Sequence, residues 1–168
     1  ISYYEEQYKE PLSLSHSELK DVITAFSTQV AGRIMPRNQM VLNKLTNKLI
    51  QTIFDAFESG ATCVYSSGVM KQYQDELDHN GVHDEKSLED LIMKNSGNLY
   101  RVHHGRICYG RRKPDVETEL INYLKEYEMP QEIESFVSRF WYIPEAVLER
   151  ELNKAEGVVA LAGRKFYY

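Results

Sequence analysis

The sequence predicts a mainly helical α+β protein in which an N-terminal helix precedes two similar units. Three observations support this prediction. Apolar residues recur at the three- and four-residue spacing of amphipathic helices along most of the chain. Short β-prone runs next to glycine turns follow some of these helices and indicate β-hairpins. Finally, residues 85–109 and 145–167 repeat one order of charged, apolar and glycine residues, and an internal repeat indicates a repeated structural unit.

The repeat is clearest when the two segments are aligned with an offset of sixty positions. The residues that then coincide are Glu85 with Glu145, Leu88 with Leu148, Glu89 with Glu149, Ile92 with Leu152, Lys94 with Lys154 and Gly97 with Gly157. Past this glycine the offset becomes fifty-eight, and Gly105, Arg106 and Tyr109 coincide with Gly163, Arg164 and Tyr167. Each segment therefore predicts a short helix, a glycine that ends it, and two strands joined by a Gly-Arg turn.

Composition places the chain among globular proteins of one or two small domains. It has 168 residues, of which 42% are hydrophobic and 27% are charged. No apolar run approaches the roughly 18 residues of a membrane span, and no signal peptide is visible. Cys63 and Cys108 cannot build a disulfide framework, so we expect a reducing compartment, cytoplasmic or, in a eukaryote, nuclear. Because the chain starts at Ile1 rather than Met, we expect it to be a processed protein or a part of a longer one.

Residues 1–37 are expected to form an N-terminal arm and a helix. Residues 1–14 fit a docked extended arm and an unstructured leader equally well. Ser15 and Glu18 have the spacing of a capping box, and the apolar positions that follow predict a helix over 16–31 that ends near Gly32. Residues 33–37 are expected to be a connector, because Pro36 disfavours helix before it.

The first unit is expected to cover residues 38–110. Its pattern predicts a long helix capped by Asn38 and ended by Gly60, a strand at 61–65, a helix at 68–79 capped by Ser66 or Ser67, a turn at Asn80-Gly81, a helix at 82–95, and two strands at 98–102 and 106–109. The segment His103-His104-Gly105 lies between these two strands.

The second unit is expected to cover residues 111–168, after the basic linker 110–114. Asp115 or Thr118 begins its first helix, and Met129-Pro130 breaks it. A helix at 131–140 follows, then an aromatic turn at 141–143, with Pro144 as the first residue of a helix that runs to Lys154. The expected core aromatics of this unit are Phe136, Phe140, Trp141, Tyr142 and Tyr167.

This order of elements resembles the winged helix-turn-helix superfamily, with two units in tandem over about residues 38–168. The resemblance depends on the order helix, helix, helix, hairpin in each unit, on the matched Gly-Arg turns and on Ile143-Pro144. It implies units of three helices plus a β-hairpin wing, in which the third helix often enters the DNA major groove and the wing touches the backbone. Other tandem winged helices resemble these units but serve only in protein assembly.

The charges favour the wings and the linker over the third helices as a DNA-binding surface. The chain has a net charge of −5, and the third helices carry several carboxylates, which phosphates would repel. The candidate phosphate-binding residues are therefore Arg101, His103, His104, Arg106, Arg111, Arg112, Lys113, Arg164 and Lys165. The alternative is that these cations only keep the hairpin tips soluble.

No catalytic motif is present, and we expect neither an enzyme nor a cofactor. His79 and His83 have a zinc-like spacing, but they flank a predicted turn and no Cys-x-x-Cys pair accompanies them, so we expect no metal site. The expected function is a non-catalytic DNA-binding or regulatory module of a larger protein, which contacts duplex backbone through wings and linker. The alternative is a protein-interaction or scaffold module of winged-helix type. We expect no membrane partner.

Overall fold

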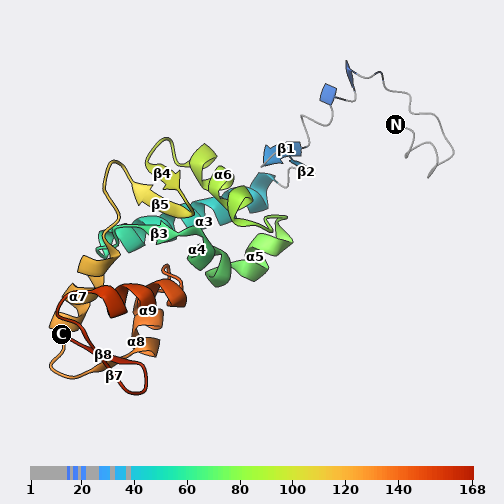
Figure 1. Cartoon of the computed structure of the whole chain (residues 1–168). Helices are drawn as coiled ribbons and strands as arrows, with labels where there is room; N and C mark the ends of the chain where they lie inside the picture. Colours follow the sequence, from blue (N-terminus) through green and yellow to red (C-terminus); the bar gives the residue numbers. More distant parts are fainter. Residues whose placement is uncertain (1–14, 16, 19, 22–26, 31–32, 37–38) are drawn as a thin grey trace. The chain divides into compact units, whose positions relative to one another are not determined.

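The computed structural model of the chain describes residues 15, 17–18, 20–21, 27–30, 33–36 and 39–168 (Figure 1). The chain divides into two compact parts, Ile1–Gln39 and Met40–Tyr168. The expectations for residues 1–14 and for the Asn38 cap lie outside the described residues. Within the described part, no helix combines the length and the apolar character that a membrane crossing requires.

The N-terminal part contains a β-hairpin where the sequence predicted helix and connector. Strand β1 (Ser27–Val30) pairs antiparallel with β2 (Arg33–Pro36). The prediction of helix up to residue 31 was therefore wrong over β1, and that of a connector was wrong over β2. The β-branched residues Thr28, Val30 and Ile34 favour extended backbone. A short apolar run is compatible with both the helical and the strand periodicity, so its spacing could not exclude a strand. Proline has no backbone N–H, and β2 tolerates Pro36 because the last residue of an edge strand need not donate a ladder hydrogen bond.

The predicted capping box is confirmed. The backbone N–H of Ser15 donates to Oε2 of Glu18 at 2.8 Å, and the N–H of Glu18 donates to Oγ of Ser15 at 3.3 Å. Residues 17, 18, 20 and 21 are helical. The start of this helix is thus determined by local hydrogen bonds that the sequence makes visible.

Two sets of elements with a similar order make up the larger part, and the first set has one helix more than the second. The first set is α3 (Gln39–Glu58), β3 (Val64–Tyr65), α4 (Ser66–Gln72), α5 (Gln74–His79), α6 (Glu85–Asn95), β4 (Tyr100–His103) and β5 (Arg106–Tyr109). The second set is α7 (Val116–Lys125), β6 (Gln131–Glu132), α8 (Ile133–Arg139), α9 (Glu145–Lys154), β7 (Val159–Leu161) and β8 (Lys165–Tyr167). Their antiparallel sheets have the orders β3-β5-β4 and β6-β8-β7. In both sets the last strand of the hairpin is therefore central.

Helix α3 is the longest helix of the described residues, and it ends where predicted. Gly60 has a φ of +104°, its N–H donates to the carbonyl of Phe57 at 3.1 Å, and the N–H of Ala61 donates to the carbonyl of Ala56 at 3.0 Å. These two bonds form a Schellman ending, which glycine favours because it has no Cβ. Of the predicted apolar stripe, Leu45, Leu49, Ile53 and Phe57 are buried.

The predicted helix over 68–79 is instead two helices, α4 and α5, that meet at Tyr73. The hydroxyl of Tyr73 shares a 2.8 Å hydrogen bond with that of Thr52 on α3. The prediction of a cap at Ser66 or Ser67 was also wrong, because α4 begins at Ser66 and has no side-chain cap. Instead, the Ser66 N–H donates to the carbonyl of Gly105, and its hydroxyl donates to Glu89. The carbonyl of a residue distant in the sequence thus accepts a hydrogen bond from the first turn of α4, where a side-chain cap would otherwise supply an acceptor.

Helix α6 begins at Glu85, three residues later than predicted. The Asp84 side chain is its cap and accepts from the N–H of Ser87 at 2.8 Å. The inward positions that the repeat predicted, including Leu88, are buried. In the following hairpin His104 and Gly105 both have positive φ, as a tight two-residue turn between twisted strands requires.

The second set contains a strand that the sequence did not reveal. The predicted helix over 131–140 was wrong in its first two residues, because β6 pairs with β8 before α8 begins. Asp115 caps α7 as predicted and accepts from the N–H of Thr118 at 3.1 Å. Pro144 is the residue before α9 rather than its first residue. Two residues are too few to show the alternation of apolar and polar residues that marks a strand, so only the pairing with β8 identifies β6.

The expected aromatic core is confirmed in part. Phe136, Phe140 and Tyr142 are buried. Trp141 is only half-buried and Tyr167 is 40% exposed, so the prediction was wrong for Tyr167. Phe166 supplies the buried face of β8 instead, because neighbouring residues of a strand point to opposite faces.

The hairpin turns correct the alignment of the repeat. The N–H of Ile133 donates to the carbonyl of Arg164 at 3.1 Å, as the N–H of Ser66 does to that of Gly105 at 2.9 Å. Arg164, with a φ of +58°, is therefore the structural equivalent of Gly105. The predicted matches of Gly105, Arg106 and Tyr109 with Gly163, Arg164 and Tyr167 were therefore wrong by one position, because the second turn has one more residue than the first.

The two sets pack together around Tyr142. The carbonyl of Tyr142 accepts from the N–H of Tyr65 at 2.9 Å, and its hydroxyl donates to the buried carboxylate of Glu119. The other oxygen of that carboxylate accepts from the N–H of Thr62. A Cβ at Gly68 would lie 2.7–2.9 Å from the backbone of Tyr142. The expected units 38–110 and 111–168 thus lie within one compact part, joined at Tyr142.

We predict that Gly68→Ala lowers the free energy of unfolding by about 1–3 kcal/mol, the usual cost of overpacking. The added methyl meets backbone rather than a flexible side chain, so α4 and the Tyr142 segment must separate. Urea denaturation would measure the change. Gln72→Ala, at an exposed site on the same helix, is the control. Equal stability of the two variants would contradict the close approach of the two sets.

Candidate nucleic-acid interface

Five cations gather along the first hairpin and the linker that follows it. We call Arg101, Arg106, Arg111, Arg112 and Lys113 the basic strip. The Nε of Arg101 donates to the carbonyl of Gly110, and the guanidinium of Arg112 lies over the ring of Tyr109 at 5.7 Å. Arg101 lies opposite Cys108 in the β4–β5 pairing, and Arg106 is two residues before Cys108 on β5, so the two arginines share one face of the sheet. The structure therefore brings most of the predicted phosphate-binding residues together.

The cations of the basic strip have no acidic partners within the described residues. The ion pairs found there at 4.0 Å or less involve other cations. Arg111, Arg112 and Lys113 are exposed. Their charges therefore remain available to an anionic ligand, whereas a paired cation must first lose its carboxylate.

The second hairpin differs, because carboxylates surround both of its predicted phosphate-binding residues. The guanidinium of Arg164 contacts Glu145 and lies 2.6 Å from Glu149. The Nζ of Lys165 lies 2.9 Å from Glu132. The hydrogen bond from Arg164 lowers the pKa of the Glu145 carboxyl, so this carboxyl stays ionised near neutral pH. The positive charge of this hairpin is thus already matched within the fold.

The two histidines lie at the turn end of the first hairpin. The ring centroids of His103 and His104 are 4.0 Å apart. A Cβ placed on Gly105 would lie 3.4 Å from a carboxylate oxygen of Glu85, so an acid covers this turn. The electrostatics therefore favour anions more at the linker end of the hairpin than at its turn.

The third helices present few available cations. On α6, Lys86 pairs with Asp90 at 3.1 Å. On α9, Arg150 pairs with Glu151 at 2.6 Å, and both residues act on the phenol of Tyr65 in β3, whose pKa burial raises. Helix α9 therefore lies beside the first set, and this part of its surface faces protein. These contacts argue against base reading by either helix.

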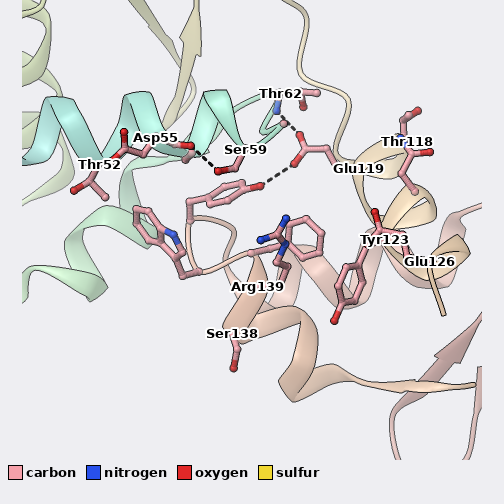
Figure 2. Close-up of a pocket in the computed structure, with 16 residues that line it drawn as sticks. Thr52, Asp55, Ser59, Thr62, Thr118, Glu119, Tyr123, Glu126, Ser138 and Arg139 are labelled. Atoms are coloured by element: carbon pink, nitrogen blue, oxygen red, sulfur yellow. Dashed lines mark hydrogen bonds between the residues drawn. The ribbon is translucent and has the colours of Figure 1, made fainter.

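A cavity of about 560 Å³ opens where the two sets meet (Figure 2). Its walls include Thr52, Asp55, Ser59, Glu119, Tyr123, Glu126, Arg139 and Trp141. Figure 2 shows Glu119 reaching from α7 toward the backbone at Thr62. Burial raises the pKa of this carboxyl, although the hydrogen bonds from Thr62 and Tyr142 act in the opposite direction. Both carboxylate oxygens accept hydrogen bonds from the fold, so Glu119 serves the packing of the two sets.

Glu119 was not among the predicted site residues, although the sequence contains a signal for it. This acid lies three residues after Val116 and directly before Leu120, on the apolar side of the α7 pattern. A carboxylate at such a position must find donors when it is buried. The partner Tyr142, by contrast, could not be found without the tertiary structure.

The candidate zinc residues are engaged elsewhere. Nδ1 of His79 lies 2.7 Å from the carbonyl of Asp75, and Nδ1 of His83 lies 2.9 Å from Oδ1 of Asp78. Within the described part of the chain, no three histidines, cysteines or acids are grouped as metal ligands. Burial raises the pKa of the Cys63 thiol to about 12, so this cysteine is a protonated core residue.

No protein-family model, curated protein or solved structure matches this chain. The arguments about its function therefore come from its own residues and geometry.

We predict that Glu119→Gln changes how stability depends on pH. Burial raises the folded pKa of Glu119, so the folded protein binds this proton more tightly than the unfolded chain does. The contribution of this group to stability is therefore largest at low pH and declines as pH rises through the raised pKa. The free energy of unfolding of the wild type minus that of Glu119→Gln should fall as the pH rises above the ordinary glutamate pKa of about 4.3.

Urea denaturation at a series of pH values would measure this difference. Glu128→Gln, which removes an exposed carboxylate from a loop, is the control and should show no such decline. A difference between wild type and Glu119→Gln that is constant or rises with pH would contradict a raised pKa at this site.

Proposed function

We propose that residues 38–168 form two winged-helix units in tandem and bind the phosphate backbone of duplex DNA through the basic strip. The sheet orders support the first half of this proposal. In both sets the short strand after the first helix pairs with the last strand of the hairpin. This arrangement supports the three helices and hairpin that the winged-helix resemblance implies for each unit, although the first set has a further short helix, α5.

The observation that carries the DNA-binding proposal is the difference in pairing between the two hairpins. The cations of the basic strip have no carboxylate partner within the described residues, whereas Arg164 and Lys165 do. Phosphate contacts of this kind position a protein on DNA without reading its sequence. We therefore propose a non-catalytic module that binds weakly, with little sequence preference and with strong dependence on salt.

A second candidate function is protein interaction, and an exposed apolar face favours it. Val159 is 53% exposed, Leu161 is 44% exposed and Tyr167 is 40% exposed. Val159 lies opposite Tyr167 in the β7–β8 pairing, and Leu161 is two residues further along β7, so the three share one face of the sheet. Exposed apolar clusters of this kind often mark protein contacts. This face lies on the second set, whereas the basic strip lies on the first.

We predict that replacing Arg111, Arg112 and Lys113 with Ala flattens the salt dependence of DNA binding. Each neutralised phosphate contributes about −0.9 to the log–log slope of affinity against salt. The triple variant should therefore lose up to about 3 units of slope if all three residues contact phosphate. A salt titration of a fluorescently labelled duplex would measure this change.

The matched control is the triple variant Lys86→Ala, Arg150→Ala and Lys165→Ala, which removes the same net charge from paired cations. Its slope should change less, because neighbouring carboxylates already offset these residues. Absence of binding at about 50 mM salt, where phosphate contacts are strong, would leave the protein-interaction function. Tight binding that is lost in the control variant would show that cations outside the basic strip meet the DNA.

A further inference from the structure

The two sets share a pair of glutamates at the start of their third helices. Glu85 and Glu89 are the first and fifth residues of α6, and Glu145 and Glu149 are the first and fifth residues of α9. The first glutamate of each pair is exposed and the second is half-buried. Because residues four apart lie on the same side of a helix, each pair presents two carboxylates together.

In the second set an arginine fills the space at this pair. The Nε of Arg164 donates to Glu149 at 2.6 Å, and one terminal nitrogen contacts both Glu145 and Glu149. The guanidinium thus spans two carboxylates, as its planar fork of donors allows. A lysine ammonium is a point charge that lacks this planar fork of donors.

In the first set this arginine is absent. The residue equivalent to Arg164 is Gly105, because its carbonyl accepts the corresponding hydrogen bond from the start of α4. A Cβ on Gly105 would lie 3.4 Å from Oε2 of Glu85, so the carboxylate borders the space where a side chain would begin. The hydroxyl of Ser66 donates to Glu89 at 2.9 Å and holds it in place.

The glutamates of the first set have no cation within 4.0 Å in the described residues. Lys86, the basic residue closest in sequence, pairs with Asp90 instead. Two carboxylates on one helix face repel each other, and a guanidinium between them would remove this repulsion, as Arg164 does in the second set.

We propose that Glu85, Glu89 and the space above Gly105 form a receptor site for an arginine side chain of a protein partner. The bound guanidinium takes the place that Arg164 occupies in the second set. Charge complementarity favours a cation, and the arginine that contacts the equivalent pair of carboxylates in the second set favours a guanidinium. The site lies at the turn end of the first hairpin, and none of its residues belongs to the basic strip, so it does not depend on DNA binding.

The first test places the missing arginine in the chain itself. Gly105→Arg should melt at a higher temperature than Gly105→Gln at low salt, because both variants carry the same strain at positive φ but only arginine bridges the two carboxylates. The difference should shrink in high salt and disappear when Glu85 and Glu89 are changed to Gln. Equal melting temperatures of the two variants would overturn the geometry of the site.

The second test adds the ligand from outside. N-acetyl-arginine amide, titrated at millimolar concentrations, should shift the backbone NMR signal of Gly105 in a saturable way. N-acetyl-lysine amide should produce a smaller shift, and N-acetyl-citrulline amide, which is uncharged, should produce none. In Gly105→Arg the backbone NMR signal of residue 105 should not shift, because the introduced side chain occupies the site.

The control for the second test uses the equivalent pair in the other set. Glu145→Gln with Glu149→Gln should leave the response of Gly105 intact, whereas Glu85→Gln with Glu89→Gln should abolish it. Equal shifts with the citrulline amide, or a response that survives the loss of Glu85 and Glu89, would overturn the proposal. So would the absence of any shift with the arginine amide.

Discussion

The carboxylate of Glu119 is the contact on which the arrangement of the two sets depends. It takes one hydrogen bond from the backbone after α3 and one from the hydroxyl of Tyr142 before α9. A buried carboxylate without donors is costly, so the two sets must supply these donors together. Gly68 allows the approach, because it leaves room for the backbone of Tyr142. A polar contact with two required donors specifies one docking geometry, which apolar packing alone does not.

This docking gives two similar sets of elements different surfaces. Helix α9 lies beside β3 of the first set, as the action of Arg150 and Glu151 on Tyr65 indicates. The second hairpin uses its arginine and lysine in ion pairs with its own helices and strand, whereas the first hairpin leads into a linker of unpaired cations. The two sets therefore have similar elements but do not present the same charged surface. The proposed roles in DNA and protein binding both arise from this asymmetry.

Much of the fold could be predicted because its causes are local. The apolar stripe of α3, its ending at Gly60 and the cap of α7 at Asp115 each depend on residues within one or two helical turns of each other. The repeated helices and hairpins were also predicted, since Leu88 and Leu148 mark equivalent buried positions. The first hairpin turn followed from its sequence, because glycine suits the positive φ that such a turn requires. The pairs Arg101 with Gly110 and Arg112 with Tyr109 then gathered the basic strip.

The sequence was sufficient to predict most helices of residues 39–168, both of their hairpins and the residue types of the basic strip, because short-range hydrogen bonds and periodicity control these features. Tertiary contacts were needed to show that β6 is a strand, that Ser66 bonds to Glu89 rather than capping α4, and that Arg164 is the counterpart of Gly105. Each of these depends on a partner more than twenty residues away in the chain. Such distant contacts also determine whether a cation has a carboxylate partner. The sequence therefore identified the cations of both hairpins but could not show which of them are paired.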